Sequence, residues 1–315
     1  MGLTILKPGL QTTVQSRARR GLRHLGIPAS GAADPLSMAL ANKLVDNSWD
    51  AALLEATLLG PALRFEANCT FALTGAVAAS TLNSDQVEQH CSINARKGDE
   101  LVVGAASSGA RVYIAFAGGL DIDAVLGSTS TCLVAGFGGH EGRALRKGDV
   151  LRLESPQLLN TARSAPAKFR PPMFGSHALR ASAAAETDQL RDSGALLFDT
   201  NWQVGERADR MGLQLDGDPL SVNSAGRMPS AAVFPGTVQC PENGAPFLLS
   251  VDGGTVGGYP RVAQVTRTDR HMLGQLKPRD RLRLLQRSPD EAVAEFRAKL
   301  AYWRPWLPQI NEILN

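Results

Sequence analysis

Short apolar runs separated by turn residues dominate the middle of the chain. Between Thr70 and Leu153, runs rich in β-branched and aromatic residues are separated by turns that contain Gly, Ser, Asn and Asp. Short strands at this spacing predict a barrel or a sandwich rather than a sheet of alternating strands and helices. The clearest predicted strands cover residues 71–74, 101–103, 111–116 and 150–153. The fold is therefore expected to be mainly β.

Helical periodicity is clear in two places. Apolar residues recur at intervals of three and four from residue 36 to residue 44, directly after Asp34 and Pro35. Asp is a good N-cap and Pro fits the first helical turn, so this pattern predicts a helix that begins at residue 35. A second helix is predicted from Asp290 to Leu300, ahead of an aromatic tail (Tyr302, Trp303 and Trp306).

The length favours two domains, because 315 residues exceed the usual size of a single core. Residues 158–187 are rich in Ala, Ser, Pro and Arg and show no sustained periodicity, as expected of a segment that crosses between domains. We therefore predict one domain over residues 1–168, a second over 169–288, and a helical tail over 289–315.

Charge and hydropathy narrow the functional classes. A net charge of +3 is too small to indicate nucleic-acid binding without a concentrated basic face. The one dense basic run (Arg17, Arg19, Arg20 and Arg23) suits an anionic substrate or partner, but its charge alone favours a solvated surface. No apolar run approaches the length of a membrane span, and we expect a cytoplasmic protein with no membrane partner.

The four cysteines are widely spaced (Cys69, Cys91, Cys132 and Cys240). They form no C-x-x-C pair and have no histidine cluster at zinc-like intervals. We expect reduced, mostly buried thiols and no metal site.

One candidate segment covers residues 9–34 and combines glycines with hydrogen-bonding side chains, among them Gln15, His24, Ser30 and Asp34. His24 has the chemistry to move a proton near neutral pH or to bind a carboxylate. A half-buried histidine bonded to the backbone fits the sequence equally well. Asp34 also suits a helix cap, and Gln15 suits the end of a strand.

A second candidate segment covers residues 235–239 and 251–261, where successive glycines lie between two strand-like runs. Its glycines, including Gly257 and Gly258, expose backbone N–H groups that suit an oxyanion or a carboxylate. Polar side chains surround them (Gln239, Asp252, Thr255, Tyr259 and Arg261). The segment lacks the G-K-[ST] ending of a P-loop and the strand-to-helix context of a dinucleotide fingerprint, which argues against nucleotide binding by those routes. A plain glycine-rich hairpin is the alternative.

A third segment places Arg210 just before a predicted strand. A guanidinium is a good bidentate clamp for a carboxylate. The alternative is a surface ion pair with Asp209 or Glu206, worth roughly 0–1 kcal/mol.

Together these segments resemble a known family. The runs T-T-V-Q, H-L-G-I-P-x-S-G-A-x-D-P, D-R-M-G, P-G-T-V-Q and G-G-Y-P occur in family order, beginning at residues 12, 24, 209, 235 and 257. The family is that of KipA, allophanate-hydrolase subunit 2 and the C subunit of 5-oxoprolinase, which is similar to the carboxyltransferase portion of urea carboxylase. The resemblance spans nearly the whole chain and implies two cyclophilin-like β-barrels.

The resemblance implies one component of a complex that hydrolyses 5-oxoproline to glutamate with ATP. Its partners would be a KipI-like protein (the B subunit) and a LamB/YcsF-like protein (the A subunit). ATP would be used by the complex, at a site on this chain or on a partner. One alternative is a KipA-type regulator that binds a KipI-like inhibitor of a sensor kinase. Another is carboxyl transfer from biotin to urea or a related amide, with biotin carried by another protein.

Under the leading interpretation, a cleft between the barrels binds a small cyclic amide. Arg210 would hold a carboxylate, His24 or Asp34 would handle a proton, and the backbone of Gly257 and Gly258 would stabilise oxyanion charge. The predicted catalytic residues are His24, Asp34, Asp252 and Tyr259, and the predicted binding residues are Gln15, Ser30, Arg210, Gln239, Thr255, Gly257 and Gly258.

The chain departs from the family pattern in the loops assigned to the site. Ser16-Arg17-Ala18-Arg19 replaces the usual D-x-G-R, which removes an acid and a glycine. Residues 252–260 lack the glutamine and one threonine of the usual D-x-Q-T-T-G-G-Y-P. Ala181-Ser182-Ala183 stands where the family has P-G-P. These differences bear on which substrate the chain accepts.

Overall fold

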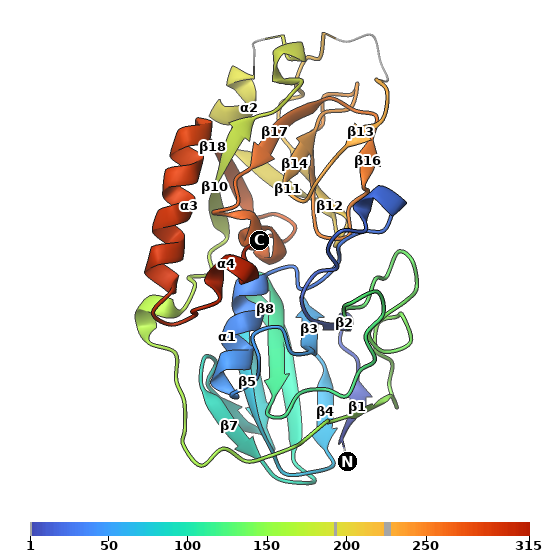
Figure 1. The fold of residues 1–315 in the computed structure, drawn as a ribbon, viewed down its shortest axis with the longest axis vertical. Helices are drawn as coiled ribbons and strands as arrows, with labels where there is room; N and C mark the ends of the chain where they lie inside the picture. The colour runs from blue at the N-terminus through green and yellow to red at the C-terminus, as the bar shows by residue number, and fades with distance from the viewer. Residues whose placement is uncertain (1, 192–193, 224–227) are drawn as a thin grey trace. The chain divides into compact units, whose positions relative to one another are not determined.

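The computed structural model describes residues 2–191, 194–223 and 228–315, and the chain divides into two compact units (Figure 1). The first unit contains residues 2–19, 30–173 and 306–313, and the second contains residues 20–29, 174–305 and 314–315. The main division falls after residue 173. Two short segments break a purely sequential division, because residues 20–29 belong to the second unit and residues 306–313 to the first.

The first unit is built on one sheet. Its nine strands, counted over the described residues, follow the path β2-β3-β8-β4-β1-β9, and β5 adds pairs with β6, β7 and β8. The 17-residue β8 pairs with β3, β4 and β5, so it connects most of the sheet. The strands are β1 (Gly2–Lys7), β2 (Gln11–Gln15), β3 (Leu53–Thr57), β4 (Ala62–Phe65), β5 (Cys69–Leu82), β6 (Asp85–Val87), β7 (Ser92–Ala95), β8 (Glu100–Phe116) and β9 (Val150–Arg152).

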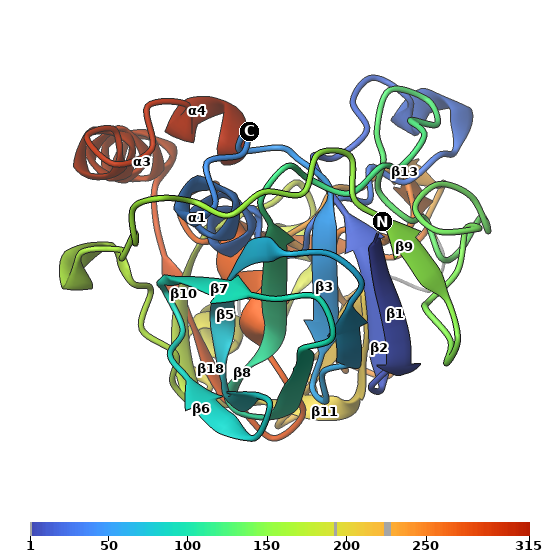
Figure 2. The ribbon, with the colours of Figure 1, turned by 90° about the horizontal axis from the view of Figure 1, so that it is seen from below.

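Helix α1 (Pro35–Leu44) packs on β5 and β8 (Figure 2). Asp34 caps it: one carboxylate oxygen accepts from Ser37 N at 3.1 Å and the other from Ser37 Oγ at 2.6 Å. The helix predicted from residue 35 is thus confirmed. The unit also contains the 3-10 helix η2 (Ala167–Phe169) and the short helix α4 (Ile310–Ile313). Trp306, which precedes α4, stacks on Phe169 of η2 with the ring centroids 5.9 Å apart.

A buried polar network fixes the chain just before α1. Tyr113 Oη donates to Glu55 Oε2 at 2.8 Å and accepts from Asp34 N at 2.7 Å. Glu55 Oε2 also accepts from Ala33 N at 2.8 Å, and Arg111 Nε lies 3.5 Å from Glu55 Oε1. Burial, followed by the nearby Glu55 charge, raises the pKa of Tyr113 well above its usual value. The phenol therefore stays protonated and can donate to Glu55.

The second unit is a closed seven-stranded barrel, β10-β17-β14-β15-β12-β11-β18, over its described residues. A parallel pair between β10 and β18 completes the closure. Its strands are β10 (Ser176–Ala183), β11 (Trp202–Ala208), β12 (Gly212–Asp216), β14 (Thr237–Gln239), β15 (Phe247–Leu249), β17 (Arg261–Val265) and β18 (Arg281–Gln286), and a separate two-stranded ribbon pairs β13 (Ala231–Ala232) with β16 (Val256–Gly257).

Helix α3 (Pro289–Trp303) follows the barrel, and a reciprocal cap between Ser288 and Glu291 defines its start. This confirms the helix predicted from residue 290. Shorter helices in the unit are η1 (Arg23–Leu25), η3 (Thr187–Gln189), α2 (Ala195–Asp199) and η4 (Arg270–Gln275). The prediction of a mainly β fold is confirmed. Within the described ranges, none of the helices has both the length and the hydropathy needed to cross a bilayer.

We expect Tyr113→Phe to destabilise the first unit by about 1–3 kcal/mol, because it removes a hydrogen bond from two buried groups. Urea unfolding measures this loss. Tyr259→Phe is the matched control, because that ring is 42% exposed and its hydroxyl makes no hydrogen bond to a described residue. Equal stability of the two variants would contradict a structural role for the Tyr113 hydroxyl.

Candidate functional site

Two turns of the second unit are joined by a buried ion pair. Arg210 Nε donates to Asp252 Oδ2 at 2.7 Å, and Arg210 Nη2 donates to Asp252 Oδ1 at 3.2 Å. The two side chains are only 3% and 1% exposed. A backbone hydrogen bond also joins the two turns, because Asp252 N donates to Arg210 O at 2.8 Å. Arg210 therefore anchors the glycine-rich turn through Asp252, rather than through Asp209 or Glu206.

Side-chain hydrogen bonds from Gln239 and Arg261 stabilise the β13–β16 ribbon. Gln239 Nε2 donates to Tyr259 O at 3.2 Å, and a Cβ at Gly257 would lie only 2.4 Å from the same Nε2. Arg261 donates to Ala232 O at 3.1 Å and forms a two-point pair with Glu186. The hydrogen bond from Arg261 lowers the pKa of Glu186. Gln239 and Arg261 thus support the backbone of the ribbon.

Arg23 fastens residues 20–29 to this ribbon. Arg23 Nη2 donates to Val233 O at 2.6 Å and to Gly254 O at 2.9 Å, and its guanidinium carbon lies 5.5 Å from the centre of the Phe234 ring. Burial lowers the pKa of Arg23. His24 follows in the 3-10 helix η1 and is exposed. The structure therefore brings the histidine segment to the glycine-rich turn within one unit.

Eight of the predicted site residues belong to the second unit: His24, Arg210, Gln239, Asp252, Thr255, Gly257, Gly258 and Tyr259. His24 and Tyr259 are exposed, whereas Arg210 and Asp252 are buried. A cavity of about 430 Å³ adjoins the 209–212 turn, with Arg207, Asp209, Met211 and Gly254 among its lining residues. Solvent therefore reaches the surface beside the turn as well as the side chains of His24 and Tyr259.

The remaining predicted residues, Gln15, Ser30 and Asp34, belong to the first unit. Asp34 is explained by its capping bonds to Ser37. Gln15 Nε2 donates to Thr13 Oγ1 at 3.0 Å and to Thr131 O at 3.3 Å, while its Oε1 is buried without a partner among the described residues. Ser30 has a φ of 51°, and its Oγ is likewise buried and unbonded there.

Arg19 corrects the expectation of a solvated basic run. It is 2% exposed, its Nε donates to Val125 O at 3.0 Å, its Nη2 donates to Ser130 O, and its guanidinium lies over the Phe137 ring. Burial of this kind leaves no local periodic signal, because Val125 and Ser130 lie more than 100 positions away from Arg19 in the sequence.

Ser16 enters a neutral network of hydroxyls at the end of β2. Its backbone N donates to Ser130 Oγ at 2.9 Å, and its own Oγ lies 3.1 Å from Ser130 Oγ and 3.4 Å from Ser128 Oγ. Ser128 Oγ in turn donates to Arg17 O at 2.7 Å. The serine that departs from the family pattern is therefore fully used in local hydrogen bonding.

Possible metal ligands and thiols occur among the described residues. In the part of the chain that the structure describes, no group of three or more His, Cys, Asp or Glu side chains is placed to hold a metal ion. Burial raises the pKa of Cys69 and of Cys240 to about 11, which makes both poor nucleophiles at neutral pH.

Comparison with known proteins identifies the family. The model of the carboxyltransferase domain, subdomains A and B, matches residues 25–286. The chain therefore belongs to this family, as its motif order indicated. The match covers the barrel of the second unit and most of the sheet of the first.

Individual relatives extend the match to nearly the full chain. The C subunit of 5-oxoprolinase from Escherichia coli is 35% identical over 92% of this chain and 93% of its own. The protein of the same name from Haemophilus influenzae is 31% identical over 99% of both chains. The crystal structure of the K. lactis urea amidolyase matches with a TM-score of 0.88 and 27% identity over 96% of this chain, but over only 20% of that protein.

We expect Arg210→Ala and Asp252→Ala each to destabilise the second unit by about 3–5 kcal/mol, because each leaves a buried charge without its partner. The double variant should lose less than the sum of the two single losses. Arg283→Ala is the control, because its ion pair with Asp199 spans 3.9 Å between exposed side chains and is worth roughly 0–1 kcal/mol. Thermal and urea unfolding of the two single variants, the double variant and the control measure these losses of stability. Additive losses in the double variant would contradict an energetic coupling between Arg210 and Asp252.

Proposed function

We propose that this chain is the C subunit of an ATP-dependent 5-oxoprolinase, which opens 5-oxoproline to glutamate together with KipI-like and LamB/YcsF-like partner proteins. The observation that carries the proposal is the end-to-end match with two proteins named as the C subunit of 5-oxoprolinase. The urea amidolyase match covers only a fifth of that larger protein, so it supports the shared fold more than a shared reaction.

Hydrolysis of a cyclic amide requires a proton donor and hydrogen-bond donors for the oxyanion, and the second unit contains candidates for both. Hydrolysis of the lactam adds a water oxygen to the ring carbonyl, breaks the C–N bond and places a proton on the departing nitrogen. His24 is suited to move that proton near neutral pH. Tyr259 presents an exposed hydroxyl, and the N–H groups of the glycine-rich turn suit the developing oxyanion.

The buried ion pair suggests a role for Arg210 and Asp252 that differs from the substrate-binding and catalytic roles predicted for them from the sequence. Because the guanidinium and the carboxylate satisfy each other at 2.7 Å and 3.2 Å, we propose that they position the glycine-rich turn instead of touching the substrate. Gln239 has a similar supporting role through Tyr259 O. Gln15 and Ser30, which have buried unbonded oxygens, keep their proposed role in binding a polar ligand.

The glycine-rich turn of this chain lacks a common feature of phosphate-binding turns. The turn leads into strands β16 and β17, so it lacks the helix N-terminus against which phosphate-binding turns place their ligand. We therefore assign ATP to the complex and derive no step on this chain through it.

Exposed apolar side chains near Arg23 support a function that requires partner proteins. Leu25 is 63% exposed, Phe234 51% and Val256 60%, and Arg23 connects all three segments. Exposed apolar groups gathered at one place are typical of protein interfaces. The four free cysteines fit the cytoplasm, where thiols stay reduced.

A second candidate, carboxyl transfer from biotin to an amide, draws on the structural match to urea amidolyase. Turnover that requires biotin and bicarbonate would favour it over lactam hydrolysis. Biotin would then arrive on another protein.

The decisive test is ATP-dependent hydrolysis of 5-oxoproline by this chain mixed with its KipI-like and LamB/YcsF-like partners. We expect turnover in the complete mixture, and His24→Asn should lower kcat by roughly 10²–10⁴-fold, the usual size of a general acid–base contribution. His140→Asn removes an imidazole outside the proposed site and should leave turnover unchanged.

Size-exclusion chromatography must show that His24→Asn still assembles with the partners. An intact complex with full turnover would remove His24 from the mechanism. Absence of turnover in the complete wild-type mixture would remove the 5-oxoprolinase assignment itself.

A further inference from the structure

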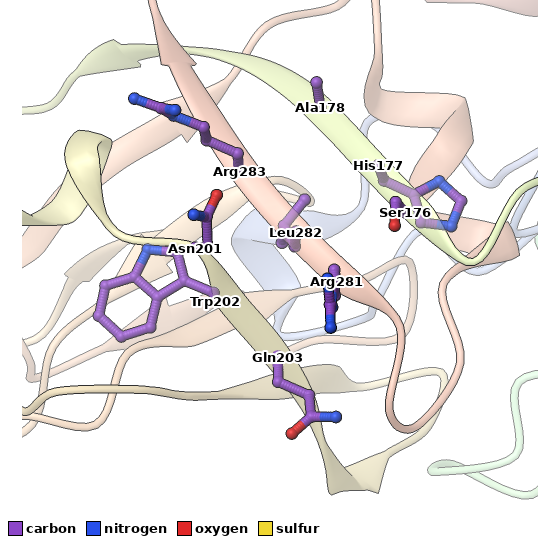
Figure 3. Close-up of a pocket in the computed structure, with 9 residues that line it drawn as sticks. All are labelled: Ser176, His177, Ala178, Asn201, Trp202, Gln203, Arg281, Leu282 and Arg283. Carbon is purple, nitrogen blue, oxygen red and sulfur yellow. The ribbon is translucent and has the colours of Figure 1, made fainter.

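A groove on the barrel wall of the second unit shares no residue with the candidate site. It has a volume of about 680 Å³, within the usual range for small-molecule sites (Figure 3). Strands β10, β11 and β18 contribute its walls. The lining residues are Ser176, His177, Ala178, Asn201, Trp202, Gln203, Arg281, Leu282 and Arg283.

Strand register explains why the groove is polar. Successive side chains of a strand point to opposite faces, so Arg281 and Arg283 reach the outside of the barrel while Leu282 enters the core. Across the sheet, Arg281 pairs with Ser176 on one side and with Gln203 on the other. Arg283 pairs with Ala178. The small side chains at 176 and 178 leave room beside the two guanidinium groups.

The lining carries two positive charges and no carboxylate. Arg281 makes no side-chain hydrogen bond or ion pair with any residue that the structure describes. Among the residues with described positions, Arg283 pairs only with the exposed Asp199, at 3.9 Å, and such a pair contributes little. Asp280, the acid next in sequence, is 4% exposed and lies behind the wall, where its Oδ2 is 3.2 Å from His177 Nε2.

The remaining polar groups of the groove include donors. The amides of Asn201 and Gln203 and the hydroxyl of Ser176 can all donate to an oxyanion. Residues two apart on a strand lie roughly 7 Å from each other, so the two guanidinium groups can hold two anionic groups of one ligand or share a single one. Figure 3 shows both arginines on β18 and Gln203 on the neighbouring β11, with Asn201 just before the start of β11.

We propose that this groove is a binding site for a small ligand that carries carboxylate or phosphate groups, held by Arg281 and Arg283 and oriented by Asn201 and Gln203. The proposal does not depend on the proposed function, because it rests on charge and geometry at the other strands of the barrel. Bidentate pairing with oxyanions is the characteristic chemistry of arginine.

Isothermal titration calorimetry of the intact chain, with inorganic phosphate and separately with glutarate, tests the site. We expect saturable binding of at least one probe, and the stronger of the two shows which anion the groove prefers. Raising the ionic strength should weaken the binding, because the contacts are charged and reachable by solvent.

Arg281→Gln and Arg283→Gln should each weaken binding at least 10-fold. Arg279→Gln is the matched control, because Arg279 is nearby and 82% exposed but does not line the groove, and it should change affinity less than twofold. Circular dichroism establishes that each variant is folded. Lack of saturable binding of both probes, or equal affinity of the three variants and the wild type, would overturn the proposal.

Discussion

The candidate site depends on the buried ion pair between Arg210 and Asp252. Two turns that are 42 positions apart are fixed to each other by two side-chain hydrogen bonds and by the backbone bond from Asp252 to Arg210. A buried pair of this kind is costly to break, because either charge alone is poorly solvated. The pair therefore fixes the start of the turn, in which Gly253 is buried and Gly254 is exposed.

The candidate site also includes residues 20–29, which come from the N-terminal part of the sequence. Arg23 uses one nitrogen to hold two carbonyl groups, from Val233 and Gly254, and so attaches residues 20–29 to the ribbon that the ion pair supports. Burial of its guanidinium lowers the pKa of Arg23, which indicates that the contact is partly shielded from water. The consequence is that the segment carrying the exposed His24 is attached to the glycine-rich turn through its neighbour Arg23.

The sequence predicted correctly those features of the fold that depend on interactions between residues close together in the chain. The start of α1 was predictable because Asp34 bonds to Ser37 three residues later, and the start of α3 because Ser288 and Glu291 cap each other. The strands were predictable from short runs of β-branched and aromatic residues that lie between turn residues. The partners of Arg210, Arg19 and Arg23 were not predictable, because they lie 42, 106 and 210 positions away in the sequence. A sequence shows that an arginine is present, but only the fold decides whether it meets a carboxylate, a carbonyl or a ligand.

The same difference between local and distant contacts distinguishes two of the three departures from the family pattern. Ser16 is 2% exposed and bonded to Ser130, so its substitution for the usual acid was accommodated inside the first unit by a set of neutral hydroxyl contacts. Val256 and Gly254 instead lie at the surface of the ribbon, where Val256 is 60% exposed and Gly254 offers its carbonyl to Arg23. The first change alters what supports the end of β2. The second alters the face that the ribbon presents, and so it bears more directly on what binds there.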